Sequence, residues 1–341
     1  MNRELFVPDK LYNFLCLGAG DANHQEIAAS YAGVDNLGLW QVAQENELES
    51  IIAHKFRDKV VADEIPEFWE NAHEVNLARI SEYMRELDRV AEALDRKGIP
   101  LVALKNSGIA RGIYPCFGCC PMGDLDLLVE RRHFREACST IINDGYCLEL
   151  RYSSRIQDLE AAESYGSAEF CKNLSAGLKL WLELQWRPVG GRWLSLKREP
   201  EGDDLIARSN EIRGTKARLL SPEDNLLSVC LHTAKHSYVR APGLRLHLDV
   251  DRIVNRQLIN WDIFLKQVLS LRVKTPVYFS LIIPKVLFDT PVPEDVLSRL
   301  KPPPWKEKVI CNWLRRVNIF KPNEQKFGKI GYLIFMYLLY D

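Results

Sequence analysis

The sequence lacks an apolar run long enough to span a lipid bilayer. Its most apolar stretch, Ile330 to Tyr340, is about half the ~20 residues that a membrane-spanning helix needs. Residues 1–15 also lack the long apolar core and the small-residue cleavage site of a signal peptide. We therefore expect a soluble, cytoplasmic protein that does not use a membrane as a partner.

The chain also lacks a large net charge of either sign. The chain has 45 basic and 46 acidic residues, which gives a formal net charge of −1. This balance removes the general electrostatic reason for tight, non-specific binding to nucleic acid. A small molecule or a protein is therefore the expected partner, and nucleic acid is disfavoured.

The nine cysteines form no evident disulfide framework, because their number is odd and most lie within apolar or helical patterns. Such usage is typical of a reducing cytoplasm. Cys116, Cys119 and Cys120 resemble half of a zinc site. No second Cys or His pair stands at zinc-finger spacing, so the zinc interpretation is disfavoured.

The composition excludes disordered and fibrous proteins. Hydrophobic residues make up 47% of the 341 residues and charged residues 27%, with glycine and proline spread along the chain. A chain of this length can form two compact units, or one mixed domain wrapped in helices.

Hydrophobic periodicity predicts an α+β fold. Helical spacing between residues 26 and 97 indicates an N-terminal helical arm that ends at Gly98, and short apolar or alternating runs after it indicate strands. We predict strands at 99–104, 124–129 and 178–186, and helices at 109–114 and 131–144. The expected fold is a small mixed sheet with flanking helices, preceded by the helical arm and followed by a C-terminal helical domain. The expected boundaries are 1–95, 96–200 and 201–341.

The C-terminal part of the sequence is expected to be helical. Ser221 and Pro222 open a helix as N-cap and first-turn residue, and two acids follow them. Further helices are predicted at 244–257, 261–271, 275–289 and 304–316, with Pro302 to Pro304 as a rigid spacer between the last two.

Two acids stand out between Gly123 and Val129, where Asp124 and Asp126 alternate with leucines. On a strand, residues i and i+2 point to the same face about 7 Å apart. Such carboxylates repel each other and are costly to desolvate unless a cation joins them. An isolated pair of this kind also occurs at the surface edge of a sheet, but a metal site resolves the repulsion.

Glu183 supplies a third carboxylate on a separate predicted strand. Mg²⁺ prefers carboxylate and phosphate oxygens, so the aspartate pair and a triphosphate together form a suitable set of ligands. A third acid on a neighbouring strand allows a second ion about 3.5–4 Å from the first.

The run from Leu101 to Val129 resembles the hallmark of an uncharacterised nucleotidyltransferase family within the DNA polymerase β-like superfamily. That hallmark is an apolar strand ending in Lys-Gly, a short helix ending in Leu-Tyr, a loop bearing Arg, and then Gly/Ser-Asp-Ile-Asp-Leu-Leu-Val. The similarity continues in the family's order at Gly145-Tyr146, Glu183 to Arg187, Ser221 to His236 and Asp249.

The resemblance implies that Asp124, Asp126 and Glu183 bind Mg²⁺ or Mn²⁺. It also implies that a nucleoside triphosphate is held by the turn Lys105, Asn106, Ser107 and Gly108, together with Gly123. A turn that opens a helix offers backbone N–H groups and a positive dipole end to phosphate. Lys105 adds a point charge and Ser107 a hydroxyl.

Three positions depart from the family pattern: Asn106 replaces a glycine, Cys120 an arginine and Gln185 a histidine. Asparagine tolerates left-handed backbone geometry, so the turn can persist. The missing arginine removes an expected phosphate contact, and another cation must replace it. The candidates are Arg111, Arg187 and Arg192.

Other polar and aromatic residues have less specific signals. His232 and His236, four residues apart on a predicted helix, could bind a metal, but a structural or acceptor-pocket role is favoured because no third ligand is evident. Asp249 either contacts substrate or forms ion pairs. The aromatic residues Trp181, Trp186 and Trp193 either stack on a base or pack in the core.

The reaction implied by the resemblance is in-line attack of an acceptor hydroxyl on the α-phosphorus of a triphosphate, with ATP expected, and release of pyrophosphate. An amine or carboxylate acceptor is an alternative. The acceptor would belong to a small molecule or a protein, and Glu183 could accept its proton. Two rival hypotheses remain: a non-catalytic interaction protein with a decayed core, and a phosphotransferase or hydrolase that uses the same carboxylates.

Overall fold

The computed structural model describes residues 9–20, 24–31, 33–57, 66–149, 158–174, 177–189 and 194–340. The chain divides into two compact units. The first, here called the sheet unit, is Ala78–Ser228, and the second, the helical unit, combines Met1–Leu77 with Val229–Asp341. Helix α5 (Glu67–Asp95) and helix α10 (Pro222–Lys235) each contribute residues to both units.

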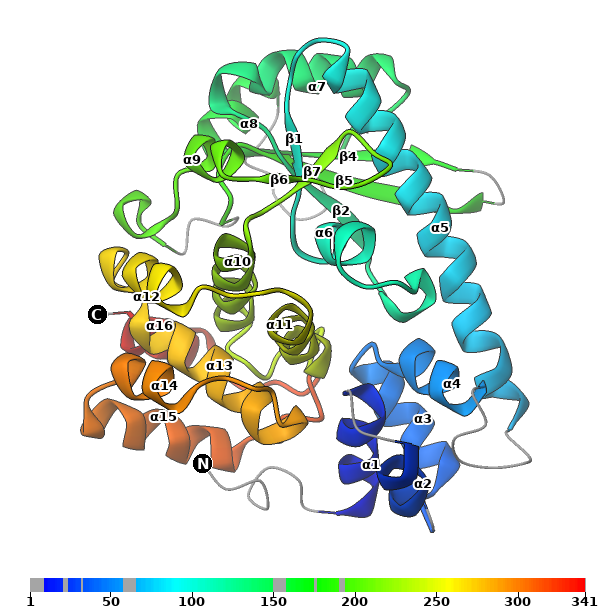
Figure 1. Ribbon diagram of the computed structural model, residues 1–341, viewed down its shortest axis with the longest axis vertical. Coiled ribbons are helices and arrows are strands. Elements are labelled where there is room, and N and C mark those ends of the chain that lie inside the picture. Colours follow the sequence, from blue (N-terminus) through cyan, green and yellow to red (C-terminus); the bar gives the residue numbers. More distant parts are fainter. Residues whose placement is uncertain are drawn as a thin grey trace. The chain divides into compact units, whose positions relative to one another are not determined.

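The sheet unit contains a seven-stranded mixed sheet of order β3-β4-β5-β2-β1-β7-β6 (Figure 1). The strands are β1 (Leu101–Ala103), β2 (Asp124–Leu128), β3 (Cys147–Leu148), β4 (Ser167–Asn173), β5 (Lys179–Gln185), β6 (Asn210–Glu211) and β7 (Ala217–Leu219). The pairs β2–β5 and β1–β7 are parallel, whereas β1–β2, β3–β4, β4–β5 and β6–β7 are antiparallel. Strands β2 and β5 therefore lie side by side near the middle of the sheet.

Helices and short 3-10 turns connect these strands. They are α6 (Lys105–Gly112), η2 (Phe117–Cys119), η3 (Arg131–His133), α7 (Phe134–Asn143), α8 (Leu159–Tyr165), η5 (Leu196–Arg198) and α9 (Gly202–Ala207). Gly145, with φ +90°, follows the end of α7 in the left-handed conformation that glycine adopts without steric cost.

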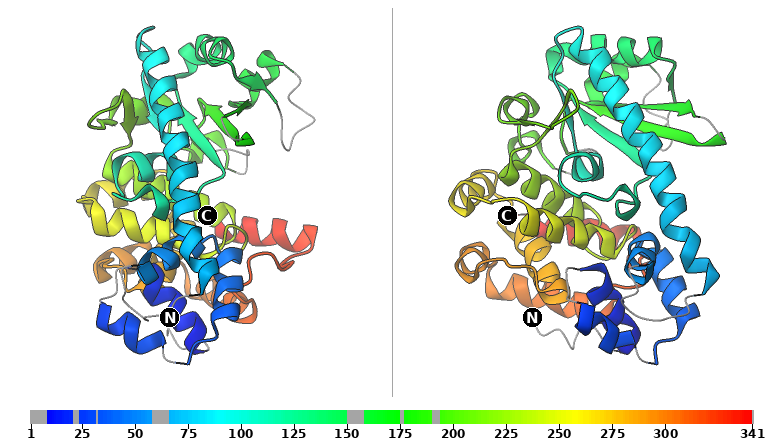
Figure 2. Two further views of the ribbon diagram at one scale, coloured as in Figure 1. Left: turned by 90° about the vertical axis from the view of Figure 1, so that its right-hand side faces the viewer. Right: turned by 45° about the vertical axis from the view of Figure 1, so that its right-hand side comes forward.

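One face of the sheet is apolar and covered by helices. Leu125 and Leu127 of β2 and Leu182 and Leu184 of β5 are fully buried there, in one core with residues of α5, α7 and α8. Figure 2 shows α5 as a single long helix that runs along the sheet unit. Because each buried leucine contributes about 1.5–3 kcal/mol, this face fixes the register of both strands.

The opposite face is mostly polar. A second, smaller core lies at one corner and consists of Val102, Leu104, Leu128, Leu205, Ile206 and Leu220. Away from that corner, β2 and β5 turn acidic and amide side chains to this face, because side chains alternate along a strand. We call it the acid face.

The helical unit consists of helices in its described residues. In addition to parts of α5 and α10 they are α1 (Lys10–Ala19), α2 (His24–Tyr31), α3 (Asn36–Glu45), α4 (Glu49–Arg57), α11 (Leu244–Arg256), α12 (Trp261–Ser270), α13 (Lys274–Phe288), α14 (Glu294–Leu300), α15 (Pro304–Arg316) and α16 (Lys329–Leu339). Along the described part of the chain, no helix combines the length and apolar character that crossing a membrane requires.

The predicted α+β fold is confirmed, with a mixed sheet and helical regions on both sides of it in the sequence. The predicted strands correspond to β1, β2 and β5, and the predicted C-terminal helices correspond to α10, α11, α12, α13 and α15. The proposed proline spacer was wrong, because α14 lies between α13 and α15 and Pro304 is the first residue of α15.

Candidate active site

The three acids named from the sequence lie on the acid face. Asp124 and Asp126 point away from the apolar core that Leu125 and Leu127 enter. Glu183 is the register partner of Asp126 in the parallel pair of β2 and β5, so the two side chains share a face. Neighbouring strands are about 4.8 Å apart, so Asp126 and Glu183 are direct neighbours across the strand pair.

Asp126 is held from several directions. Its Oδ1 accepts hydrogen bonds from Lys105 Nζ at 2.5 Å and from Gln185 Nε2 at 3.0 Å. Its backbone N–H donates to Ser107 Oγ at 3.0 Å. The side chain is nearly buried, with the residue 7% exposed. The orientation of Asp126 is therefore set by α6 on one side and by β5 on the other.

Burial and neighbouring charges shift the pKa values of Asp126 and Lys105. Burial raises the pKa of Asp126 to about 7; Lys105 opposes this shift, and Asp124 and Glu183 add to it. Burial by itself would lower the pKa of Lys105, but the Asp126, Glu183 and Asp124 carboxylates outweigh it and raise the pKa. The Lys105 ammonium thus interacts with all three carboxylates, and Asp124 and Glu183 repel the charged form of Asp126.

The Lys105–Gly108 segment is the first turn of α6, not a separate turn before a helix as the sequence suggested. The left-handed residue is Lys105, with φ +48°, rather than Asn106. Asn106 Nδ2 instead donates to Pro121 O at 3.3 Å, which ties α6 to the loop before β2. The first turn of α6 retains the backbone N–H groups that lack an intrahelical acceptor.

Gly108 is required by close packing. A Cβ at this position would lie 2.6 Å from the backbone oxygen of Ala103, a distance that real Cβ atoms do not reach. The absence of a side chain lets α6 approach the end of β1, and this approach brings Lys105 to Asp126. Gly123, by contrast, has open space around its Cβ position directly before β2.

A comparison with protein families matches residues 33–289, more than half of the chain, to a family described as uncharacterised nucleotidyltransferase. The chain belongs to this nucleotidyltransferase family. A comparison with curated proteins found no match. The matched segment contains the acid face, α6 and most of the helical unit, so the family resemblance noted in the sequence is confirmed.

Two of the arginines proposed to replace the family's loop arginine are already paired. Arg187 donates through Nε and Nη2 to Glu199 Oε2, at 3.1 and 2.6 Å. Arg111 donates through Nε to Asp88 at 2.9 Å. Arg192 lies outside the described residues. Arg111 and Arg187 thus already have carboxylate partners, as Lys105 has in Asp126.

Sequence reasoning missed two residues of the acid face. Gln185 was noted only as a departure from the family's histidine, yet it binds Asp126 directly. Glu169 in β4 is the register partner of Glu183 and extends the row of acids across the sheet. The alternation of Ala168 and Phe170 with polar residues was the signal for β4.

The residues of the acid face are suited to binding a divalent metal ion. Carboxylate oxygens are the ligands that Mg²⁺ and Mn²⁺ prefer, and three carboxylates lie on one face, where each interacts with Lys105. Gln185 is fully buried, and within the described residues its Oε1 has no hydrogen-bond partner. A buried acceptor of this kind beside a carboxylate can take a hydrogen from a bound water or ligand.

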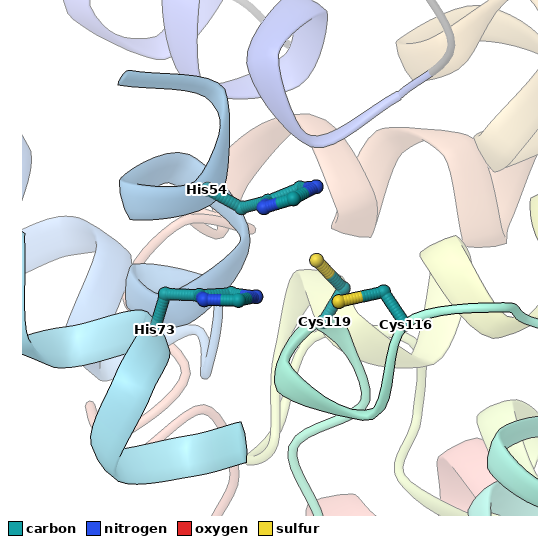
Figure 3. Close-up of side chains that lie close together, drawn as sticks. All are labelled: His54, His73, Cys116 and Cys119. Carbon is teal, nitrogen blue, oxygen red and sulfur yellow. The ribbon is translucent and has the colours of Figure 1, made fainter. Parts of the chain in front are cut away.

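Two cysteines and two histidines occur in close pairs, each pair within one unit (Figure 3). Cys116 directly precedes the short η2 turn of the sheet unit and Cys119 is the last residue of that turn, and their Sγ atoms lie within 4.8 Å of each other. His54 and His73 of the helical unit stack with ring centroids 4.6 Å apart. Cys120, the third thiol of the disfavoured zinc interpretation, is buried in the apolar core.

The histidine and aspartate candidates lie in the helical unit. The His232 and His236 rings meet edge to face with centroids 4.8 Å apart, and His236 lines a cavity of about 620 Å³ with Arg240 and Tyr332. Asp249 is buried in α11 and pairs with Arg245 at 3.5 Å. Arg245 is thus the ion-pair partner that one of the two interpretations of Asp249 requires.

The tryptophans have separate surroundings. Trp181, half-buried on the acid face, is the register partner of Asp124 and lies under Lys179 Nζ at 4.4 Å. Trp186 donates to Glu163 O at 2.8 Å and packs against the core. Trp193 lies outside the described residues.

Proposed function

We propose that the chain is a metal-dependent nucleotidyltransferase that transfers a nucleoside monophosphate from a triphosphate, expected to be ATP, to an acceptor. The observation that carries the proposal is the register of β2 and β5, which pairs Asp126 with Glu183 and leaves Asp124 on the same face. Family membership supports the reaction class. The acceptor is proposed to be a hydroxyl of a small molecule or a protein.

Asp124, Asp126 and Glu183 would hold Mg²⁺ or Mn²⁺, which when bound would neutralise charge on the triphosphate. Lys105 Nζ and the N–H groups that open α6 would bind phosphate oxygens, because both present positive potential to an anion. In the reaction, the acceptor oxygen forms a bond to the α-phosphorus and the bond to the bridging oxygen of the β-phosphate breaks. Pyrophosphate leaves, and Glu183 accepts the acceptor's proton.

Most of the rate enhancement would come from positioning and charge neutralisation rather than from covalent chemistry. Asp126 is prepared for this role by the contacts from α6 and β5 that fix its carboxylate. All nine cysteines fall within the described residues and none is in a disulfide, which supports a reducing, cytoplasmic setting. The near-zero net charge disfavours nucleic acid as the acceptor.

The test uses ATP labelled at either the α- or the γ-phosphorus, incubated with the protein, Mg²⁺ and a metabolite or protein extract. Transfer of the α label with release of pyrophosphate is the expected result, whereas transfer of the γ label would indicate a phosphotransferase. Asp124→Asn/Asp126→Asn should abolish transfer. Glu149→Gln is the matched control, because Glu149 is an exposed acid bonded to Lys179 and Cys171. No transfer with any of the four triphosphates would overturn the proposal.

A further inference from the structure

One oxygen of Asp126 accepts two hydrogen bonds, from Lys105 and from Gln185. The Lys105 side chain is 14% exposed and that of Asp126 10%, so water screens this ion pair poorly. Charge-assisted bonds between an ammonium and a carboxylate are shorter and stronger than neutral hydrogen bonds, and this one is 2.5 Å long. Lys105 therefore occupies the position from which a cation would neutralise Asp126.

A divalent cation on Asp126 would compete with Lys105 for the same carboxylate. Two positive groups within a few ångströms repel strongly where the effective dielectric constant is low. Binding of a cation to Asp126 must accordingly move the ammonium away. The four-carbon stem of lysine allows such a movement without a change in the backbone.

A triphosphate bound at the start of α6 would give the displaced ammonium a second partner. Lys105 is the first residue of α6, so its side chain originates beside the N–H groups that we propose to bind phosphate. An incoming triphosphate would supply the negative charge that Lys105 loses when it leaves Asp126.

We propose that Lys105 is an internal counter-cation that couples the two ligands: it holds Asp126 in the metal-free site and passes to the triphosphate when a divalent cation takes its place. This inference rests on the proposed function. Its consequence is that metal alone binds weakly, and metal with nucleotide binds well. A site built this way avoids collecting cations when no substrate is present.

Gln185 is the positioning residue for this exchange. Its Nε2 donates to the same Asp126 oxygen and carries no charge, so it can hold the carboxylate before and after Lys105 leaves. Its buried Oε1, without a hydrogen-bond partner in the described structure, is available to a water molecule carried in by the cation. The histidine of the family pattern also has a ring N–H that can donate to a carboxylate.

The experiment measures two affinities in the full chain: Mn²⁺ alone, by electron paramagnetic resonance, and the Mn²⁺ complex of α,β-methylene ATP, which cannot transfer its nucleotide. In Lys105→Met we expect Mn²⁺ alone to bind about tenfold tighter and the Mn²⁺–nucleotide complex about tenfold weaker, a coupling within the usual range. A tighter affinity for Mn²⁺ alone together with a weaker affinity for the Mn²⁺–nucleotide complex is the result that the exchange predicts. Weakening of both affinities, or an unchanged Mn²⁺ affinity, would overturn it.

Lys179→Met is the matched control, since Lys179 is also a lysine of the sheet unit but contacts Glu149 and Trp181. Both affinities should stay unchanged in that variant. If Lys105→Met is poorly folded without metal, its unfolding temperature provides the second measurement. Mn²⁺ should then raise that temperature more in the variant than in the wild type, and an equal or smaller rise would contradict the exchange.

Gln185→Leu and Gln185→His distinguish two roles of Gln185: its hydrogen bond to Asp126 and the space that its side chain fills. Loss of the donor in Gln185→Leu should weaken Mn²⁺ binding by about 10–100-fold, as for other residues that orient metal ligands. Gln185→His should restore most of the affinity, and failure to do so would remove Gln185 from the scheme.

Asp126→Asn distinguishes failure of this inference from failure of the proposed function. Mn²⁺ binding that survives this substitution would contradict the proposed metal site itself. Binding that depends on Asp126 but does not tighten in Lys105→Met would contradict only the exchange.

Discussion

At the scale of single residues, Glu183 combines a proposed chemical role with an electrostatic cost. It lies beside Asp126 with Asp124 on the same face, and its charge helps to raise the pKa of Asp126, which shows that the two carboxylates repel each other. Groups arranged for catalysis often reduce the stability of the fold in this way.

Glu183→Gln should therefore abolish activity without harming the fold. Nucleotidyl transfer should fall by about 10²–10⁴-fold, because both a metal ligand and a proton acceptor are lost. The unfolding temperature in metal-free buffer should stay unchanged or rise, because one repelling charge is gone. Label transfer and thermal unfolding measure the two effects, and a large drop in stability would argue against an electrostatic cost at this position.

Asp249 provides a pH-dependent test in the helical unit. Burial raises the pKa of Asp249 from its ordinary value to about 6, although Arg245 and Arg252 oppose this shift and Glu47 adds to it. A carboxyl whose pKa is higher in the folded state stabilises the fold at low pH, and this contribution disappears as the pH rises through the folded pKa.

Asp249→Asn should remove this dependence. Relative to the variant, the wild type should lose stability as the pH rises from about 4 to about 6, and the difference should then level off. Urea unfolding of both proteins across this pH range provides the measurement. A difference that grows in the opposite direction would mean that the ion pair with Arg245 outweighs burial.

At the scale of elements, the contact of α6 with β1 determines where Lys105 lies. A Cβ at Gly108 would meet the Ala103 backbone oxygen at 2.6 Å and Leu219 Cδ1 at 3.0 Å. The backbone cannot yield as a flexible side chain can, so α6 would have to shift.

Gly108→Ala should thus destabilise the chain by about 1–3 kcal/mol and lower transfer, despite the better helix propensity of alanine. Gly331→Ala in α16 is the matched control, because a Cβ there would make only an ordinary contact with Phe327, at 3.7 Å. The control should be neutral or slightly stabilising in chemical unfolding. Equal effects of the two substitutions would disprove the packing argument.

Strong hydrophobic patterns made part of this arrangement predictable. The alternation around Asp124 and around Glu183 predicted β2 and β5, and adjacency followed only from the family resemblance and the need to neutralise the acids. Strand β7 could not be predicted, because three residues carry too little periodicity and its pairing with β1 is a distant contact. The contact of Gln185 with Asp126 needs a known register, which periodicity does not supply.

The start of α6 was predicted incorrectly for a local reason. Lys105-Asn106-Ser107-Gly108 is polar and contains a glycine, which is typical of a turn. The helix forms nonetheless, because Ser107 and Gly108 are buried against β1 and β2 and Ser107 Oγ accepts the Asp126 N–H. Tertiary packing here outweighs local propensity.

At the scale of the whole molecule, ligand binding should be visible as a change confined to one unit. A ligand that binds only the folded state at 100 times its Kd stabilises that state by about 2.7 kcal/mol. ATP with Mg²⁺ should raise the unfolding temperature, and Asp124→Asn/Asp126→Asn should abolish the rise.

Hydrogen exchange would locate this effect along the chain. Added protection should appear in peptides of α6, β2 and β5, since these elements carry the proposed ligand-binding groups. Protection confined to α11, or to the cavity beside His236, would move the nucleotide site to the helical unit.

The parallel pairing of β1 with β7 also affects how the protein is made. Leu101 pairs with Ala217, so a nascent chain emerging from the ribosome displays one unsatisfied edge of β1 until the residues up to 219 have been translated. Exposed strand edges recruit other chains, and late closure lengthens the time during which this can happen. The edge of β1 therefore stays open to pairing with other chains until that point in translation.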